Sequence, residues 1–513
     1  MLTTNELLRQ EWTRFRRPGR LIAIAAVALA VLALGLLYAS GNRASCDGPC
    51  PADPTGPTGS RVTDRFFFHH RDLGETGSIT VRMTSMTGTI TYPPPNHDRI
   101  VPGLVPWAKA GIIIKDGARQ GTSYAALMLT GSHGVRMQYD YHHDIVGSAV
   151  GADAVSPESP LWLRLTRSGS TITGYESADG KQWSKVGTAK LSALPGTVQV
   201  GLFATSPGDL TLRPVGLGGA TEEVRFTQAG GVFDSVGLEG TASAGGWRSD
   251  AIGEMNTTDW EKYHNASGAV AEANGKVTVA GVGDIGPAGT EGGRPVERLL
   301  VGLTLGLLIT LVVAVRFVTS EYRREPAGGA PATRRVLVGR AIVVGSVTFT
   351  AGLLAVVLVI PVGVAVLEGN GMSVIGVSPF TGVRVVVGTA AVLGLMSVLA
   401  LALGALLRRG WLAILVAVSA IALPYALTSF PLLDDGLSQW LLRTTPAAGF
   451  AVQQTLVEYP QVTAHYAPSA GYFPLPWWAG VGVLCAYTVT VLSLALRRLP
   501  PSGGRAAQPA DWQ

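Results

Sequence analysis

The sequence predicts a multi-pass α-helical membrane protein with an all-β sandwich inserted after its first helix. Only 15% of the 513 residues are charged, 47% are hydrophobic and the mean hydropathy is +0.30, whereas globular domains carry roughly 25% charged residues. Apolar segments of membrane-spanning length are separated by one long polar segment with strand-like patterning. The formal net charge is only +5, which is too small to indicate a nucleic-acid-binding protein.

Six apolar windows are long enough to cross a membrane. A bilayer core about 30 Å thick needs roughly 20 helical residues at about 1.5 Å each. None of the windows carries a charged side chain in its interior, and the second is the shortest. The windows are Leu21–Ser40, Leu299–Val315, Ala341–Leu367, Val385–Leu407, Trp411–Pro431 and Trp477–Leu496.

Arginines mark every second junction between these windows, which sets the orientation. We expect both termini in the cytoplasm, residues 41–296 outside, and a location in the plasma membrane. The arginines are Arg9, Arg14, Arg16, Arg17, Arg20, Arg316, Arg323, Arg324, Arg334, Arg335, Arg340, Arg408, Arg409, Arg497, Arg498 and Arg505. The predicted divisions are a leader helix (1–20), the first transmembrane helix (21–40), a linker (41–59), the sandwich (60–215), a glycine-rich β extension (216–296), five further helices (297–498) and a tail (499–513).

The first window has two other interpretations. A basic start before an apolar run is also typical of a cleaved signal peptide, but this run is longer than usual and no clean small-x-small cleavage site follows it. Cys46 is a candidate lipoprotein cysteine, but Arg43 stands where such signals need an apolar residue. An uncleaved first helix also keeps the predicted sides of the connections between the remaining five helices consistent with their arginines.

Only three cysteines occur, and two of them lie close together. Cys46 and Cys50 belong to Cys-Asp-Gly-Pro-Cys just outside the first helix, where a disulfide can persist. The ring would be small and would contain a proline, so a disulfide and two free thiols remain equal alternatives. Cys485 lies in the sixth window and is interpreted as a small packing residue.

The long polar segment has the alternation of β-strands. In Leu161-Trp162-Leu163-Arg164-Leu165 the leucines fall on one face of a strand. Ser168-Gly169 and Asp179-Gly180 supply hairpin turns, so Leu161–Arg167, Ser170–Ser177 and Lys181–Val186 form a meander and the segment forms a sandwich. Other expected strands are Ser78–Gly88, Ala110–Lys115, Ser123–Gly131, Gly134–Tyr141, Thr197–Ser206, Val232–Gly240 and Lys276–Pro287. Residues 216–296 either complete the sandwich or form a second small β module.

Three stretches of this segment are similar to the concanavalin A-like, laminin-G-like lectin family. They are Trp107–Asp116, Leu161–Gly169 and Gly174–Trp183, in matching order and spacing. The resemblance covers about residues 60–215 and implies a jelly-roll sandwich in a superfamily that often binds glycans, although many members serve for adhesion or spacing. Trp107, Trp162 and Trp183 are the candidate glycan contacts, with core packing as the alternative role.

The residues before the first window have the pattern of an amphipathic helix. Asn5–Arg17 places Leu7, Leu8, Trp12 and Phe15 toward one side and arginines at the rim, as in a helix along the inner headgroups. A disordered basic leader is the alternative.

This leader, the Thr319-Ser-Glu-Tyr-Arg323 segment, the six-helix count and the Leu406-Leu-Arg-Arg409 turn resemble the type-2 family of ABC export permeases. The match covers the leader and all six helices. It implies leader residues Glu11, Trp12, Arg14 and Arg16, and a cytoplasmic loop that couples to an ATPase subunit. The sequence departs from the family by Glu325–Pro331, which interrupts the loop, and by the large outer segment.

The coupling loop also has a physical rationale. A short charged segment between two helices can bind a soluble partner and pass a displacement to both helices. Glu321, Arg323 and Arg324 would form ion pairs with that partner and Tyr322 would pack between them. The alternative is that these residues only stop translocation and extend to the headgroups.

Missing motifs exclude several classes. The sequence has no Gly-x-x-x-x-Gly-Lys-Ser/Thr loop, so ATP would be bound by a partner and not by this chain. No Asp, Glu or Lys lies deep in a window, which argues against a proton relay. The histidine pairs His69-His70 and His142-His143 have no zinc-site spacing, and we expect neither a metal, a cofactor nor a catalytic site.

The sequence therefore predicts a permease subunit of an ATP-driven ABC exporter for an amphipathic or lipid-like substrate, paired with a second permease copy or a similar subunit and with a cytoplasmic ATPase. The role of the outer sandwich would be gating, docking or the binding of a surface glycan. A membrane-anchored glycan-binding or sensing protein without transport is the principal alternative, and an anchored enzyme is a third.

Overall fold

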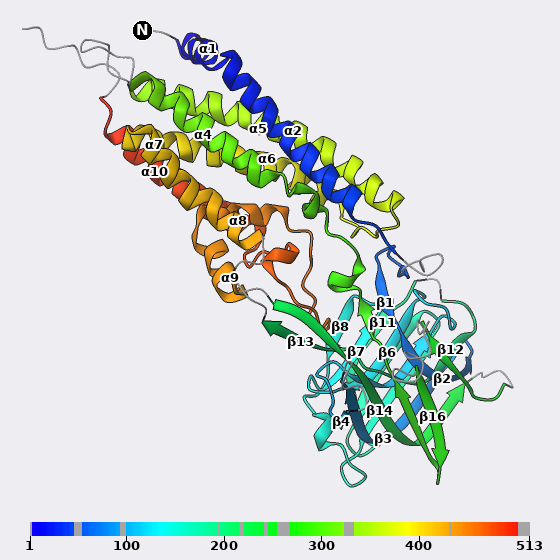
Figure 1. Ribbon diagram of the computed structural model, residues 1–513. Helices are drawn as coiled ribbons and strands as arrows, with labels where there is room; N and C mark the ends of the chain where they lie inside the picture. The colour runs from blue at the N-terminus through cyan, green and yellow to red at the C-terminus, as the bar shows by residue number, and fades with distance from the viewer. Residues whose placement is uncertain are drawn as a thin grey trace, which may run out of the picture.

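The computed structural model separates into a helix bundle and a β-sandwich (Figure 1). It describes residues 3–45, 54–92, 99–192, 194–214, 220–240, 245–253, 267–322, 333–429 and 433–500. The sandwich lies at one end of the bundle. The beginning of the first helix, the end of α4, the beginning of α5 and the end of α10 lie at the other end.

Each of the six apolar windows forms a helix long and apolar enough to cross a membrane. The prediction of these helices is confirmed. The hydrogen bonds within each helix satisfy the backbone groups that hydrocarbon cannot solvate, and the mostly apolar side chains suit the bilayer core. The helices are α2 (Pro18–Gly41), α4 (Leu303–Tyr322), α5 (Arg334–Gly369), α6 (Pro379–Leu407), the continuous run of α7 (Gly410–Ala417), η5 (Val418–Ala422) and α8 (Leu423–Ser429), and α10 (Trp477–Arg497).

The second window is displaced along the chain. Residues Val296–Leu300 form the 3-10 helix η4, and α4 begins at Leu303 and continues to Tyr322. The expected span Leu299–Val315 is therefore shifted, because Phe317 and Val318 extend the apolar run beyond Arg316. The expected windows contained no charged side chain, but the observed spans are longer and include Arg316 of α4, Arg340 of α5 and Arg384 of α6.

Short helices complete the helical part. The leader forms α1 (Thr4–Phe15), where a reciprocal capping box joins Thr3 and Glu6, as expected of a stable helix start. Between α8 and α10 the chain folds back near the sandwich (Figure 1). It forms α9 (Asp435–Thr444), η6 (Pro446–Gln453) and η7 (Pro468–Ala470).

Two sheets make up the sandwich. The nine-stranded sheet contains β11 (Ser184–Lys190), β10 (Thr171–Ser177), β9 (Leu161–Ser168), β3 (Thr76–Thr91), β14 (Ala220–Gly240), β17 (Lys276–Gly281) and β16 (Gly268–Ala273), with β13 (Asp209–Pro214) on β14 and β4 (Ile100–Pro102) on β3. The seven-stranded sheet contains β15 (Arg248–Ile252), β2 (Phe66–Leu73), β12 (Val198–Thr205), β5 (Lys109–Lys115), β6 (Tyr124–Thr130), β7 (Val135–Tyr139) and β8 (His143–Val146). Residues 220–281 thus supply strands to both sheets.

The core lies between the two sheets. Leu161, Leu163 and Leu165 of β9 are buried in one hydrophobic cluster with side chains of β5, β6 and β12, so the alternation read from the sequence is confirmed. A second cluster covers the outer face of the seven-stranded sheet. There β1 (Val62–Asp64) and β18 (Ile285–Pro287) pair with each other and lie over the sheet.

Several strands differ from the sequence expectation. The expected run Lys276–Pro287 divides into β17 and β18, and the expected Val232–Gly240 is the second half of β14. The starts of β11 and β2 have identifiable causes. β11 begins at Ser184 and not at Lys181, because the Asp179 carboxylate accepts hydrogen bonds from the amides of Lys181 and Gln182, both at 2.8 Å. That side chain lengthens the turn. β2 was not expected, because Phe66–His70 are buried on both faces and show no alternation.

Candidate functional sites

The leader helix α1 is held to the bundle by a buried ion pair. The Glu11 carboxylate accepts a hydrogen bond from Arg340 Nε of α5 at 3.0 Å and one from Arg14 Nη1 at 2.9 Å. The side chains of Glu11 and Arg340 are only 1% and 4% exposed. Because removing one partner leaves a buried charge uncompensated, such a pair fixes the position of α1 on α5.

Phe317 of α4 extends this contact to two further helices. Its ring packs edge-on against Phe15 at 5.2 Å between centroids. The guanidinium groups of Arg20 and Arg340 lie 4.7 Å and 5.8 Å from the ring centroid, within cation–π range. We call Glu11, Phe15, Arg20, Phe317 and Arg340 the leader clasp. It joins α1, α2, α4 and α5 at the end of the bundle that is remote from the sandwich.

The predicted leader residues have different environments. Glu11 is buried in the clasp, and Arg14 pairs with it at the rim. Trp12 is 42% exposed and Arg16 is exposed. Arg340 was identified in the sequence only as an orientation charge. Its position directly before an apolar window gave no sign of a buried partner far away in the chain.

The predicted coupling residues follow the clasp along the chain. Glu321 and Tyr322 form the last residues of α4, and Arg323 and Arg324 lie outside the described residues. The helix ends on either side are anchored. Arg20 Nη2 donates to Ser320 Oγ at 3.2 Å, and Arg334 Nε donates to the carbonyls of Leu496 and Leu499 at 3.0 and 3.1 Å.

A cavity lies at the opposite end of the bundle. It has a volume of about 440 Å³ and is bordered by residues of α2, η4, α4, α8, η6 and η7. Glu297 lines it and accepts hydrogen bonds from the amide and hydroxyl of Thr455, and its burial raises the pKa of the Glu297 carboxyl. Gln453 also lines it and is 1% exposed. Among the described residues its Nε2 has no hydrogen-bond partner.

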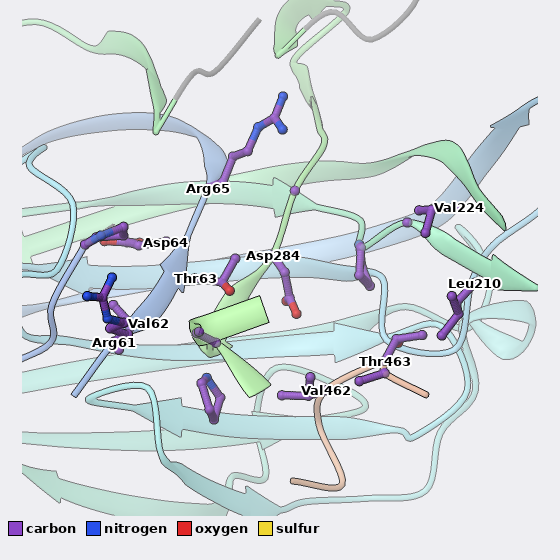
Figure 2. A pocket seen from close by; sticks show the side chains of 18 of the residues that line it. Arg61, Val62, Thr63, Asp64, Arg65, Leu210, Val224, Asp284, Val462 and Thr463 are labelled. Atoms are coloured by element: carbon purple, nitrogen blue, oxygen red, sulfur yellow. The ribbon is translucent and has the colours of Figure 1, made fainter. Parts of the chain in front are cut away.

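Another cavity, of about 390 Å³, separates the sandwich from the α9–α10 connection. Figure 2 shows Asp64 and Asp284 on the β1–β18 side and Val462 and Thr463 on the connection. His465 bridges the two parts. Its ring nitrogens lie 3.2 Å from Glu222 of β14 and 2.5 Å from Asp435 of α9.

Buried charges support the sandwich side of this cavity. Lys115 Nζ donates to Asp64 Oδ2 at 2.7 Å, and Tyr141 Oη donates to the same oxygen at 2.7 Å. Lys109 Nζ donates to Asp284 Oδ1 at 2.5 Å. Burial lowers the pKa of Lys115 and raises that of Tyr141. Because Lys109 and Lys115 are fully buried and paired, they hold β1 and β18 on the sheet and do not face a ligand.

The structure brings together only two of the three candidate glycan-binding tryptophans. Trp162 points outward from β9 beside Gly180, and Trp183 lies under the Arg164 guanidinium at 3.9 Å. Both are half-buried on the outer face of the nine-stranded sheet. Trp107 is 6% exposed and stacks on His133 at 4.0 Å between centroids, so it is a packing residue away from the other two.

The remaining predicted residues do not form a site in the described part of the chain. Cys46 and Cys50 lie outside it, and Cys485 is a half-buried free thiol in α10. Within the described ranges, no three His, Cys, Asp or Glu side chains come together in a way that would hold a metal ion. His70 instead contacts Gln199 and Asp250.

No protein-family model matches this chain, and no curated protein matches its sequence. Three solved structures resemble part of it. A functionally unknown protein from Saccharomyces cerevisiae is 16% identical, covers 34% of this chain and 74% of its own, and has a TM-score of 0.19. Scytalido-glutamic peptidase is 8% identical, with 42% and 98% covered and a TM-score of 0.27. The GH43 protein BlXynB from Bacillus licheniformis is 16% identical, with 34% and 28% covered and a TM-score of 0.18. At these TM-scores the likenesses carry no argument about function.

Proposed function

We propose that this chain is the membrane-spanning permease subunit of an ATP-driven exporter of the ABC type-2 family, with the energy supplied by a separate ATPase subunit. The observation that carries the proposal is the leader clasp. It ties an amphipathic N-terminal helix, through a buried ion pair, to the helix that begins directly after the predicted coupling loop.

The clasp explains how a force at this end would reach the bundle. A partner that pushes on residues 321–333 displaces the ends of α4 and α5. Phe317 and Arg340 link those ends to α1 and α2, and Arg334 links α5 to α10. Packed elements with fixed polar contacts move as units, so the force is distributed over several helices and not absorbed by one loop.

The charge distribution supports the orientation in this proposal. The clasp, the coupling residues, the Arg408-Arg409 turn and the end of α10 carry most of the arginines of the bundle, whereas Arg298, Arg384 and Arg443 lie toward the other end. Basic connections of this kind face the cytoplasm. The sandwich, attached at the other end (Figure 1), would then face outward in the plasma membrane.

The outer end offers an exit that the sandwich can control. The cavity beside Glu297 and Gln453 lies between α4 and α8, and the α9–α10 connection joins it to the sandwich contact at His465. In this proposal the helices of two permease copies, identical or similar, form the pathway, and the sandwich restricts or directs release.

The test is affinity purification of the tagged full-length protein in mild detergent, with mass spectrometry of the bound proteins. We expect a stoichiometric ATP-binding subunit that is lost when Glu321, Arg323 and Arg324 are changed to Ala. Arg497→Ala, an exposed arginine at the same end, is the matched control and should retain the subunit. A protein that is recovered without an ATPase would contradict the proposal.

A membrane-anchored glycan-binding protein is the second candidate, and one observation favours it. Trp162, Arg164 and Trp183 form an aromatic and cationic patch on the outer face of the nine-stranded sheet. Indole rings stack on sugar rings through their apolar faces. Retention of the full-length protein on cell-wall glycans, lost in the Trp183→Ala variant and kept in Trp107→Phe, would support this function.

A further inference from the structure

A large groove at the clasp end of the bundle combines an apolar floor with a basic rim. It has a volume of about 1280 Å³, above the roughly 300–1,000 Å³ of pockets for drug-sized ligands. α4 contacts both α2 and α7, and the groove runs along α4 between them. The lining residues are Arg17, Pro18, Gly19, Arg20, Ala23, Leu308, Ile309, Val312, Val313, Arg316, Thr319, Ser320, Gly410, Trp411 and Ile414.

The polar and apolar parts of the groove are segregated along α4. Leu308, Ile309, Val312 and Val313 form the floor toward the middle of the span, and Arg316 lies one turn nearer the clasp end. From Leu308 to Arg316 the helix rises by about 12 Å at 1.5 Å per residue. This length accommodates several methylene groups below a charged head.

Three arginines converge on the rim, and none of the described residues that line the groove is acidic. Arg20 is held by the Ser320 hydroxyl and the Phe317 ring. Arg17 and Arg316 are exposed, and neither forms an ion pair with a described side chain. An ionised side chain in a membrane span is costly unless it has a partner. A phosphate accepts charge-assisted hydrogen bonds from arginine in a geometry that lysine does not match.

We propose that this groove binds an anionic amphiphile, a phosphate-bearing head with acyl chains, and that this is the substrate class of the exporter. The phosphate lies among Arg17, Arg20 and Arg316, and the chains lie along Leu308–Val313 beside Trp411. The assignment as substrate rests on the proposed permease function, whereas the binding itself does not.

The fluorescence of Trp411 can report on lipid bound in this groove. It lines the groove and is 65% exposed. The experiment uses the full-length protein in nanodiscs with brominated phosphatidylglycerol or brominated phosphatidylcholine, and the difference between wild type and the Trp411→Phe variant isolates its fluorescence. We expect phosphatidylglycerol to quench Trp411 at a lower mole fraction than phosphatidylcholine.

The arginines are tested by the double variant Arg17→Gln/Arg316→Gln. The preference for the anionic lipid should fall by about 25-fold, because each arginine contributes about fivefold at roughly 1 kcal/mol. Arg335→Gln/Arg497→Gln removes two exposed arginines at the same end but outside the groove, and should retain the preference. Inorganic phosphate should not displace the lipid, because the chains contribute to binding.

Three results would overturn the proposal: equal quenching by both lipids, the same loss in both double variants, or Trp411 shielded from lipid by a second copy of the chain. Capture of the ATPase subunit by the same variants separates the two hypotheses. Lipid preference without any ATPase in wild type would leave the binding site and reject the exporter. An ATPase bound to a protein without lipid preference would support the exporter and reject the lipid-binding site.

Discussion

At the scale of single residues, the sequence did not show which charged side chains are buried. Glu11 and Arg340 are separated by more than three hundred positions, and each stands in a segment whose other charges face outward. Lys115 and Asp64 likewise lie at strand ends, where charges usually face solvent. Only the tertiary pairing shows which charged side chains are enclosed. The candidate site residue Glu11 was identified from a family resemblance, and its partner was not.

Glu11 gives the first prediction. Changing Glu11 to Gln should lower stability by about 3–5 kcal/mol, because it leaves Arg340 buried without a counter-charge. Glu6→Gln, at the exposed cap of the same helix, should cost less than about 1 kcal/mol. Thermal unfolding in detergent measures both. A Glu11→Leu/Arg340→Leu double variant should recover most of the loss, and failure to do so would show that the pair is not buried.

The two tyrosines of the outer-face cluster give a second prediction. Tyr124 and Tyr141 are both buried, which raises the pKa of both hydroxyls. Their protonated forms therefore stabilise the folded state below pH 10, and this contribution is lost as the pH rises through the folded pKa values. The full-length protein should lose stability above pH 10.

The matched substitutions separate the roles of these two hydroxyls. Tyr141 Oη donates to Asp64, whereas among the described residues Tyr124 Oη has no partner. Tyr141→Phe should destabilise the protein by about 1–3 kcal/mol, and Tyr124→Phe should be neutral or stabilising. Urea unfolding at pH 8 and pH 11 measures both effects. Equal losses in the two variants would contradict the assigned hydrogen bonds.

At the scale of elements, alternation identified β9, short apolar runs identified the fully buried β5 and β6, and the fully buried start of β2 was missed. β9 has three buried leucines at alternate positions and was identified with its turn. β2 lies between β15 and β12, with Phe66–His70 all buried, so no alternation marks it. The helices were easier to predict, because membrane spans are recognised by length and composition. Because the same criterion ends an apolar run at a charged residue, Arg316 placed the expected end of α4 too early in the chain.

His465 provides the prediction at this scale, because it links three elements. Changing His465 to Ala should release the α9–α10 connection from β14 and α9, since both ring contacts are lost. Hydrogen–deuterium exchange should increase in residues 459–472, 209–214 and 220–225. His133→Ala, which removes a ring stacked on Trp107 elsewhere in the sandwich, should leave exchange in these segments unchanged. Unchanged hydrogen–deuterium exchange in the His465→Ala variant would contradict the proposed link.

At the scale of the whole molecule, the sequence predicted two parts, and the structure adds how they meet. Arg61 Nη1 donates to Ser373 Oγ at 2.6 Å, which joins the start of the sandwich to the α5–α6 connection. Arg294 exchanges backbone hydrogen bonds with Ser373 and Ile375. These contacts join connections far apart in the chain, and no local pattern identifies them.

The orientation of the two parts is the last prediction. In a background with all three cysteines changed to Ala, Lys190→Cys on β11 should react with a membrane-impermeant maleimide in intact cells. Arg335→Cys at the start of α5 should react only after lysis, because the basic end is expected in the cytoplasm. Both positions are exposed. The opposite labelling pattern would reverse the topology and exclude coupling to a cytoplasmic ATPase at residues 321–324.

The attachment of the sandwich limits how the helices can rearrange. Two covalent connections hold it to α2 and α4, Arg61 holds it to the α5–α6 connection, and His465 holds it to α9 and the segment before α10. Any motion that separates α5 from α10 at this end must therefore break one polar contact or rotate the sandwich with the helices. In the proposed exporter, the sandwich would therefore act as a mechanical latch, and the strength of these contacts would set a threshold for opening the outer end in each transport cycle.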